Sequence, residues 1–248
     1  MKNPLPLTRP LCAITAYDYA FASMAQESGL DFILVGDSMA NVMLGLSHTK
    51  DIQAETMYPW VAAVARGAPQ THLVADMPLS STQSAQRALQ VAQSFLAAGA
   101  DAVKVEGYQP EIIQTLLRAQ IPVMGHMGLL PQTAKSFKQV NYSEEQERQL
   151  LAEILELQGY GMYALVLEHI PQALAQRITT QIQIPTIGIG AGPYTSGQIL
   201  VLHDVLGLSQ GKPPSFSQAF AQLRSAGIQG MTAYRMAVKD HDFPRKSL

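Results

Sequence analysis

The strongest constraint on the fold is a regular alternation that runs the length of the chain. Short apolar segments, most of which end in Gly, Asp, Glu or His, are each followed by a longer stretch with helical periodicity. We predict strands at Leu11–Thr15, Phe32–Val35, His72–Ala75, Ala102–Val105, Val123–Gly125, Ala164–Leu167, Thr186–Ile189 and near Ile199–Leu202. We predict helices at Tyr19–Ser28, Ala54–Ala65, Thr82–Ala98, Glu111–Arg118, Ser143–Leu157, Gln172–Thr180 and Ser215–Val238.

Eight strands alternating with helices in 248 residues predict an α/β fold of the (β/α)₈ TIM-barrel type. We expect one barrel domain over residues 1–248, with a helical tail at its C-terminal end. A doubly wound open sheet is the alternative. No Gly-x-Gly-x-x-Gly motif opens the first helix, so the sequence gives little support to a dinucleotide-binding fold.

Composition excludes several classes of protein. With 47% hydrophobic residues, the chain has enough apolar surface to fold. A formal net charge of −2 argues against a nucleic-acid partner. The uncharged stretch Ile178–His203 contains four glycines and two prolines, so we predict no membrane span there. Only 15% of the residues are charged, which suggests either a surface covered by other copies of the chain or one rich in uncharged polar residues.

The single cysteine, Cys12, cannot form an internal disulfide, which fits a reducing, cytoplasmic compartment. Because Cys12 lies in an apolar run, we expect its side chain to be buried as a small hydrophobic group.

Three carboxylates follow three consecutive predicted strands: Asp37, Asp76 and Glu106. In a barrel, chemistry takes place at the C-terminal ends of the strands, and neighbouring strands are about 4.8 Å apart. Carboxylates that converge there repel one another unless a cation neutralises them. Oxygen ligands of this kind favour Mg²⁺, and the sequence has no Cys/His cluster typical of zinc.

Other ionisable groups stand at the same end of the predicted barrel. Lys104 lies two residues before Glu106, so both side chains face the same side of the strand. His126 ends the fifth strand, and Glu168 follows the apolar sixth strand. An apolar setting raises the pKa of a carboxyl group, so Glu168 is a candidate general base.

Each of these residues also has a structural interpretation. Asp37 and Asp76 could cap the helices that follow them. Lys104 and Glu106 could form an internal ion pair, and His126 could be a hydrogen-bonded core residue. The functional interpretation is favoured because five successive strand ends all carry ionisable groups, which separate structural roles would not require.

Six motifs in order resemble the ketopantoate hydroxymethyltransferase (3-methyl-2-oxobutanoate hydroxymethyltransferase) family. They are Ile14–Asp18, Val35–Ser38, Arg66–Pro69, Val103–Gly107, Gly125–Leu129 and Ile187–Gly192. The resemblance extends from about Thr15 to about Pro244 and implies a barrel of the phosphoenolpyruvate/pyruvate-like type. It implies an enzyme of pantothenate biosynthesis that transfers a hydroxymethyl group from 5,10-methylenetetrahydrofolate to 2-oxoisovalerate.

The resemblance also implies roles for individual residues. The metal ligands for Mg²⁺ would be Asp37, Asp76 and Glu106, and Glu168 would be the catalytic base. Binding of the 2-oxo acid would involve Asp37, Ser38, Asp76, Lys104 and His126. Members of the family form homo-oligomeric decamers, so a decamer is expected here as well.

The chain departs from the family pattern in residues 46–53, in a shortened loop at residues 135–142 and at the C-terminus. These changes concern the acceptor, the folate donor and loop closure more than proton removal. Two alternatives therefore stay open: a divergent paralogue that enolises another 2-oxo acid to form or break a C–C bond, and a non-catalytic binding protein on the same scaffold.

Overall fold

The computed structural model describes the chain except for residues 1–4, 6–9, 135–138, 210, 212 and 245–248. Contacts divide the chain into two compact units, residues 1–200 and residues 201–248. The expectation of one domain over residues 1–248 therefore stays a prediction. None of the described helices combines the length and hydrophobicity needed to cross a membrane.

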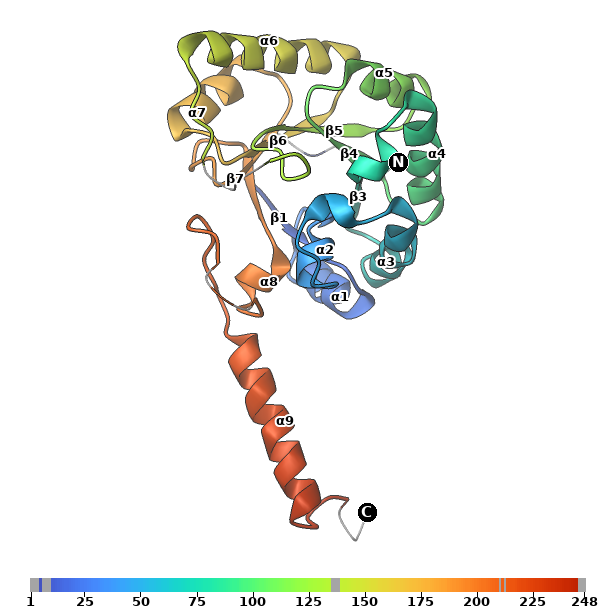
Figure 1. Ribbon diagram of the computed structural model, residues 1–248, viewed down its shortest axis with the longest axis vertical. Helices are drawn as coiled ribbons and strands as arrows, with labels where there is room; N and C mark the ends of the chain where they lie inside the picture. Colours follow the sequence, from blue (N-terminus) through green and yellow to red (C-terminus); the bar gives the residue numbers. More distant parts are fainter. Residues whose placement is uncertain (1–4, 6–9, 135–138, 210, 212, 245–248) are drawn as a thin grey trace. The chain divides into compact units, whose positions relative to one another are not determined.

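The first unit is a closed barrel of parallel strands in the order β1 to β8 (Figure 1). The strands are β1 Leu11–Thr15, β2 Phe32–Val35, β3 His72–Asp76, β4 Ala102–Glu106, β5 Val123–Gly128, β6 Ala164–Glu168, β7 Thr186–Ile189 and β8 Gly197–Leu200. The predicted barrel is confirmed, and the open doubly wound sheet is excluded because β8 pairs with β1.

Helices follow the strands and surround the barrel (Figure 1). In the first unit the helices are α1 Tyr19–Glu27, α2 Met39–Val42, α3 Ala54–Gly67, α4 Ala85–Ala97, α5 Pro110–Arg118, α6 Glu144–Tyr160 and α7 Gln172–Gln181, with 3₁₀ turns at Thr49–Asp51 and Leu79–Ser81. Ser143 caps α6 in a capping box with Gln146. Because α6 starts where a cap is available, its start was predictable to within one residue.

The core of the barrel consists of side chains from its strands. Phe32 on β2, Val74 on β3, Met124 on β5 and Ile187 on β7 are buried in one cluster. Such a filled interior makes the barrel a rigid support rather than a pore. Polar side chains therefore gather in the C-terminal parts of the strands, where the apolar layers stop.

Two predictions about β1 and β8 are wrong in detail. Cys12 is exposed rather than buried, because Ala13 and Leu11 take the buried positions of β1. The last strand begins at Gly197, two residues before the predicted start. A side chain at Gly197 would lie 2.5 Å from the backbone oxygen of Leu11, so the pairing of β8 with β1 requires glycine there.

The second unit contains α8 Leu202–Val205 and α9 Leu223–Lys239. The long helix starts at Leu223 rather than at the predicted Ser215. The reason is that backbone N–H groups before it bond back to the α8 region: Phe220 N–H donates to the Val205 carbonyl at 2.8 Å, and Leu223 N–H donates to the Leu206 carbonyl at 2.9 Å. These bonds hold the chain in a turn where helical periodicity alone predicted helix.

Candidate active site

The ionisable residues predicted from the strand ends form one connected network. Lys104 lies opposite Asp76 in the β3–β4 register, and Glu106 lies opposite His126 in the β4–β5 register. The Lys104 Nζ is 2.9 Å from Asp76 Oδ1 and 3.3 Å from His126 Nδ1. The predicted convergence of Asp76, Lys104, Glu106 and His126 is therefore present in the folded chain.

His126 connects this network to Glu168. Its Nδ1 lies 3.5 Å from Glu106 Oε2, and its Nε2 lies 3.3 Å from Glu168 Oε2. Burial and the Lys104 ammonium lower the pKa of His126, but the adjacent carboxylates of Glu106 and Glu168 outweigh them and raise it to about 9. His126 thus lies between two carboxylates and is not an isolated core histidine.

Lys104 is buried, with 5% of its side chain exposed. Burial lowers its pKa, whereas the carboxylates of Asp76, Glu106 and Asp37 raise it above the usual value. The effect of the carboxylates on the pKa is larger than that of burial, so the Lys104 ammonium stays charged inside the barrel mouth. The sequence left open whether Lys104 pairs with Glu106, and in the structure its direct ion pair is with Asp76.

Asp37 is held within the network and does not cap the helix that follows. Its N–H donates to Asp76 Oδ2 at 3.2 Å, and its Oδ2 accepts a hydrogen bond from Gln132 Nε2 at 2.9 Å. The cap position of α2 belongs to Ser38, whose side chain makes no capping bond. Burial and the neighbouring Asp76 carboxylate raise the pKa of Asp37 well above its usual value.

Ser38 lies at the edge of the same cluster. Its hydroxyl oxygen is 2.8 Å from the hydroxyl oxygen of Tyr17, a residue that follows β1 and is 1% exposed. Tyr17 belongs to the first of the six motifs, but nothing in its spacing indicated a contact with Ser38. The bond fixes the direction of the Ser38 hydroxyl at the mouth.

Gln132 is the main site residue that sequence reasoning missed. It is 3% exposed and lies in the loop between β5 and α6. Its N–H donates to Glu106 Oε1 at 2.9 Å, and its side-chain amide donates to Asp37 and to the Met77 carbonyl. One residue thus joins two of the three predicted metal ligands. The available signal was an uncharged polar side chain shortly after a strand end, which is too common to single out.

The donor atoms of this cluster are of the type that binds a hard divalent cation, but their arrangement is not that of a formed metal site. Asp37, Asp76 and Glu106 are buried carboxylates at the ends of adjacent strands, and oxygen donors of this kind are the ligands that Mg²⁺ prefers. Among the described residues, no group of three or more His, Cys, Asp or Glu side chains stands in an arrangement that could hold a metal ion. The carboxylate oxygens bond instead to Gln132 and Lys104.

A comparison with protein families decides the family of this chain. A family model described as ketopantoate hydroxymethyltransferase matches residues 6–246. The chain belongs to the ketopantoate hydroxymethyltransferase family. It is therefore an enzyme, and the reaction class is hydroxymethyl transfer.

Curated relatives from distant organisms agree with this family. The 3-methyl-2-oxobutanoate hydroxymethyltransferase of Caldivirga maquilingensis is 46% identical over 95% of this chain and 91% of its own length. The enzyme of the same name from Desulfitobacterium hafniense is 44% identical over 98% of this chain and 89% of its own length.

Solved structures share the fold at low sequence identity. A 2,3-dimethylmalate lyase of the PEP mutase/isocitrate lyase superfamily is 14% identical, with a TM-score of 0.63 over 97% of this chain and 87% of that one. A phosphonopyruvate hydrolase solved with oxalate and Mg²⁺ is 12% identical, with a TM-score of 0.64 over 96% of this chain and 85% of that one. These likenesses confirm the predicted type of barrel.

The contacts of Gln132 predict a stability effect that depends on metal. A Gln132→Met variant keeps the volume and the backbone N–H bond to Glu106 but removes the amide from Asp37. Without Mg²⁺, we expect it to lose about 1–3 kcal/mol of unfolding free energy, because a buried acceptor is left unpaired. Excess Mg²⁺ should recover most of this loss. Urea unfolding with EDTA or with Mg²⁺ measures it, and Gln181→Met on exposed α7 is the control. An equal loss under both conditions would contradict a link to the metal.

Proposed function

We propose that this chain transfers a hydroxymethyl group from 5,10-methylenetetrahydrofolate to 2-oxoisovalerate, giving ketopantoate for pantothenate biosynthesis, with Mg²⁺ as cofactor. The family and its relatives support the reaction class. The observation that carries the site assignment is a contrast in exposure. Glu168 has 15% of its side chain exposed, whereas Asp76, Lys104 and His126, which connect to it, have 2%, 5% and 3%.

This contrast supports Glu168 as the catalytic base. The base must reach a C–H bond of the substrate, so its carboxylate has to face the mouth while its partners stay buried. The His126 Nε2 atom lies 3.3 Å from Glu168 Oε2, so the imidazole is close enough to hold the carboxylate in place by charge attraction. Glu168 would take the C3 proton of 2-oxoisovalerate and leave an enolate that attacks the one-carbon unit.

Asp37, Asp76 and Glu106 would hold Mg²⁺. When bound, the ion would supply Lewis-acid polarisation of the substrate keto group. Ser38 and Lys104 would bind the acid, the lysine by neutralising its carboxylate. Overall, C3 loses a proton and bonds to the donated carbon, that carbon's bonds to the folate nitrogens break, and water supplies the hydroxyl oxygen.

An isotope experiment tests this function. The purified protein is incubated with Mg²⁺ and 2-oxoisovalerate in D₂O, and C3 deuteration is followed by NMR with and without methylenetetrahydrofolate. Exchange together with formation of ketopantoate supports the proposal. The divergent-paralogue alternative is motivated by the altered residues 46–53 and 135–142, of which 135–138 lie outside the described residues. It predicts exchange without product. A non-catalytic protein would exchange no 2-oxo acid.

We further propose that the enzyme is a cytoplasmic homo-oligomer without nucleic-acid partners, and a decamer on the family resemblance. A cytoplasmic place is supported by the single, unpaired Cys12. Self-association is supported by α9, which has no buried residue. Its Met231, Tyr234 and Val238 are 67%, 60% and 41% exposed and lie at helical spacing on one face. An apolar face of this kind suits an interface between copies.

A charge on this face should therefore weaken self-association. We expect Met231→Lys to shift the protein from its largest species to smaller ones in sedimentation velocity, because a buried unpaired ammonium is costly in an interface core. Gln229→Lys, two residues away on the same helix, is the matched control and should leave the assembly unchanged. A monomeric wild-type protein would refute the proposal before any variant is made.

A further inference from the structure

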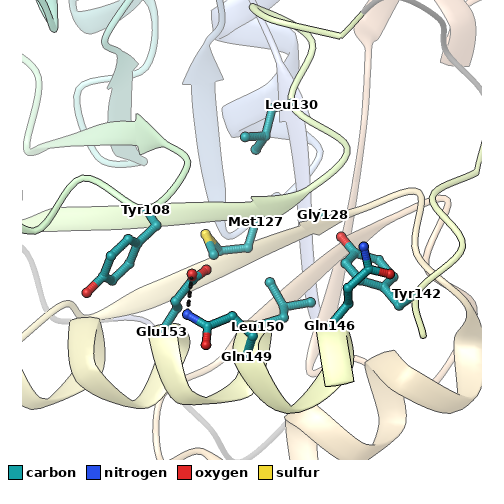
Figure 2. Close-up of a pocket in the computed structure, with 9 residues that line it drawn as sticks. All are labelled: Tyr108, Met127, Gly128, Leu130, Tyr142, Gln146, Gln149, Leu150 and Glu153. Carbon is teal, nitrogen blue, oxygen red and sulfur yellow. Dashed lines mark hydrogen bonds between the residues drawn. The ribbon is translucent and has the colours of Figure 1, made fainter. Parts of the chain in front are cut away.

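A cavity of about 330 Å³ lies between β5 and α6, outside the residues assigned so far (Figure 2). Its volume is within the range of small-molecule sites. Met127 of β5 and Leu150 of α6 contribute apolar walls, and Tyr108 and Tyr142 also line it. In Figure 2 the two tyrosines stand at opposite ends of the drawn group, with Met127 and Leu150 between them.

The cavity adjoins the charged network through shared strand ends. Tyr108 comes two residues after Glu106, and Gly128, which also lines the cavity, is the register partner of Glu168. A side chain at Gly128 would lie 2.3 Å from the Glu168 carbonyl oxygen, so glycine allows this close approach. A ligand in the cavity would therefore lie beside the proposed base, where a second substrate has to be.

The side of α6 that lines the cavity carries a row of polar residues. Gln146, Gln149 and Glu153 follow one another at helical spacing along the lining. The two glutamines are exposed at the rim, and Glu153 is partly buried. Gln149 Nε2 donates to Glu153 Oε1 at 2.8 Å. A carboxylate has about four acceptor positions, so Glu153 keeps acceptor capacity for a ligand.

The two tyrosines are held near this polar stripe. The Tyr108 hydroxyl donates to Glu156 Oε2 at 2.6 Å, and Glu156 also accepts from the Tyr160 hydroxyl. Burial raises the pKa of Tyr142, and the Glu153 carboxylate raises it further, which indicates that Tyr142 and Glu153 share one partly buried environment. Aromatic walls and an acceptor edge thus occur together.

We propose that this cavity binds the pterin ring of the folate donor, an inference that rests on the proposed function. A pterin is a flat heterocycle whose edge carries adjacent N–H donors and a carbonyl acceptor. Glu153 accepts from the N–H groups, Gln149 or Gln146 donates to the carbonyl, and Tyr142 contacts the ring face. The one-carbon unit of the donor then points to the barrel mouth and Glu168.

The test separates donor binding from proton removal. In Glu153→Gln, loss of the charged acceptor should raise the Michaelis constant for methylenetetrahydrofolate about 10- to 100-fold. Tyr142→Ala should raise it about 2- to 10-fold. In both variants, donor-free deuteration of 2-oxoisovalerate at C3 should stay within twofold of wild type. Glu145→Gln removes a charge from the exposed first turn of α6, outside the cavity, and is the matched control.

Titration with tetrahydrofolate alone gives a second measurement that needs no turnover. Wild type should bind it, and Glu153→Gln should weaken this binding by the same factor as the Michaelis constant. Tetrahydrofolate binding that is unchanged in both variants overturns the proposal. A loss of C3 exchange as large as the loss of folate binding also overturns it. So does dissociation of the oligomer without any change in folate binding. If wild type binds tetrahydrofolate at the cavity but makes no ketopantoate, the proposed function fails while the pterin site stands.

Discussion

Replacing Glu168 by glutamine should lower the rate of C3 proton exchange by about 10²–10⁴-fold, the usual contribution of a general base. The substitution keeps the size of the side chain and its position at the end of β6. It removes the charge that faces His126 Nε2 across 3.3 Å, and with it the ability to take a proton. Deuteration of 2-oxoisovalerate in D₂O measures this step without any folate.

Three further readings make this result specific to base catalysis. The variant should keep its thermal midpoint near that of wild type and should bind tetrahydrofolate normally, since Glu168 does not line the α6 cavity. Glu168→Asp should recover part of the rate, because it restores a carboxylate at a greater distance from the substrate. Exchange within tenfold of wild type in Glu168→Gln would show that another group takes the proton.

The sequence predicted which charged residues come together at the barrel mouth, and the reason is physical. The C-terminal ends of parallel strands meet at one rim of the barrel. A polar residue at the end of each apolar run is therefore placed at that rim, next to the polar residues of the neighbouring strands. Asp76 and Lys104, for example, come from different strands and stand opposite each other in the register. Their 2.9 Å ion pair is a consequence of strand order, which apolar periodicity reveals.

The parts that could not be predicted depend on loops and on close packing. Gln132 reaches Asp37, which is 95 residues away in sequence, through a loop path that no periodic pattern encodes. The cavity between β5 and α6 likewise depends on the spacing between these two elements, which is set by side chains on both. The predicted burial of Cys12 is wrong because an apolar run does not show which of its residues point away from the barrel.

Replacing Lys104 should have the second large effect, on both rate and stability. Lys104→Ala removes the cation that faces Asp76 across 2.9 Å in a site where both side chains are at most 5% exposed. Breaking one side of a buried ion pair costs about 3–5 kcal/mol of unfolding free energy, because the remaining charge is buried without a partner. Under the proposed role of Lys104 in binding the acceptor carboxylate, loss of its charge should lower kcat/KM by about 10²–10³-fold.

Metal dependence distinguishes these two effects. With the ammonium gone, Asp37, Asp76 and Glu106 have one fewer cation nearby, so Mg²⁺ should raise the thermal midpoint of Lys104→Ala more than that of wild type. The rate loss should persist at saturating Mg²⁺, since the ion cannot take the place of Lys104 at the acceptor carboxylate. Arg118→Ala, at an exposed cation in the last turn of α5, is the control and should change neither quantity. Recovery of kcat/KM by Mg²⁺ alone would mean that Lys104 acts only by balancing the charge of the carboxylates and does not bind the substrate.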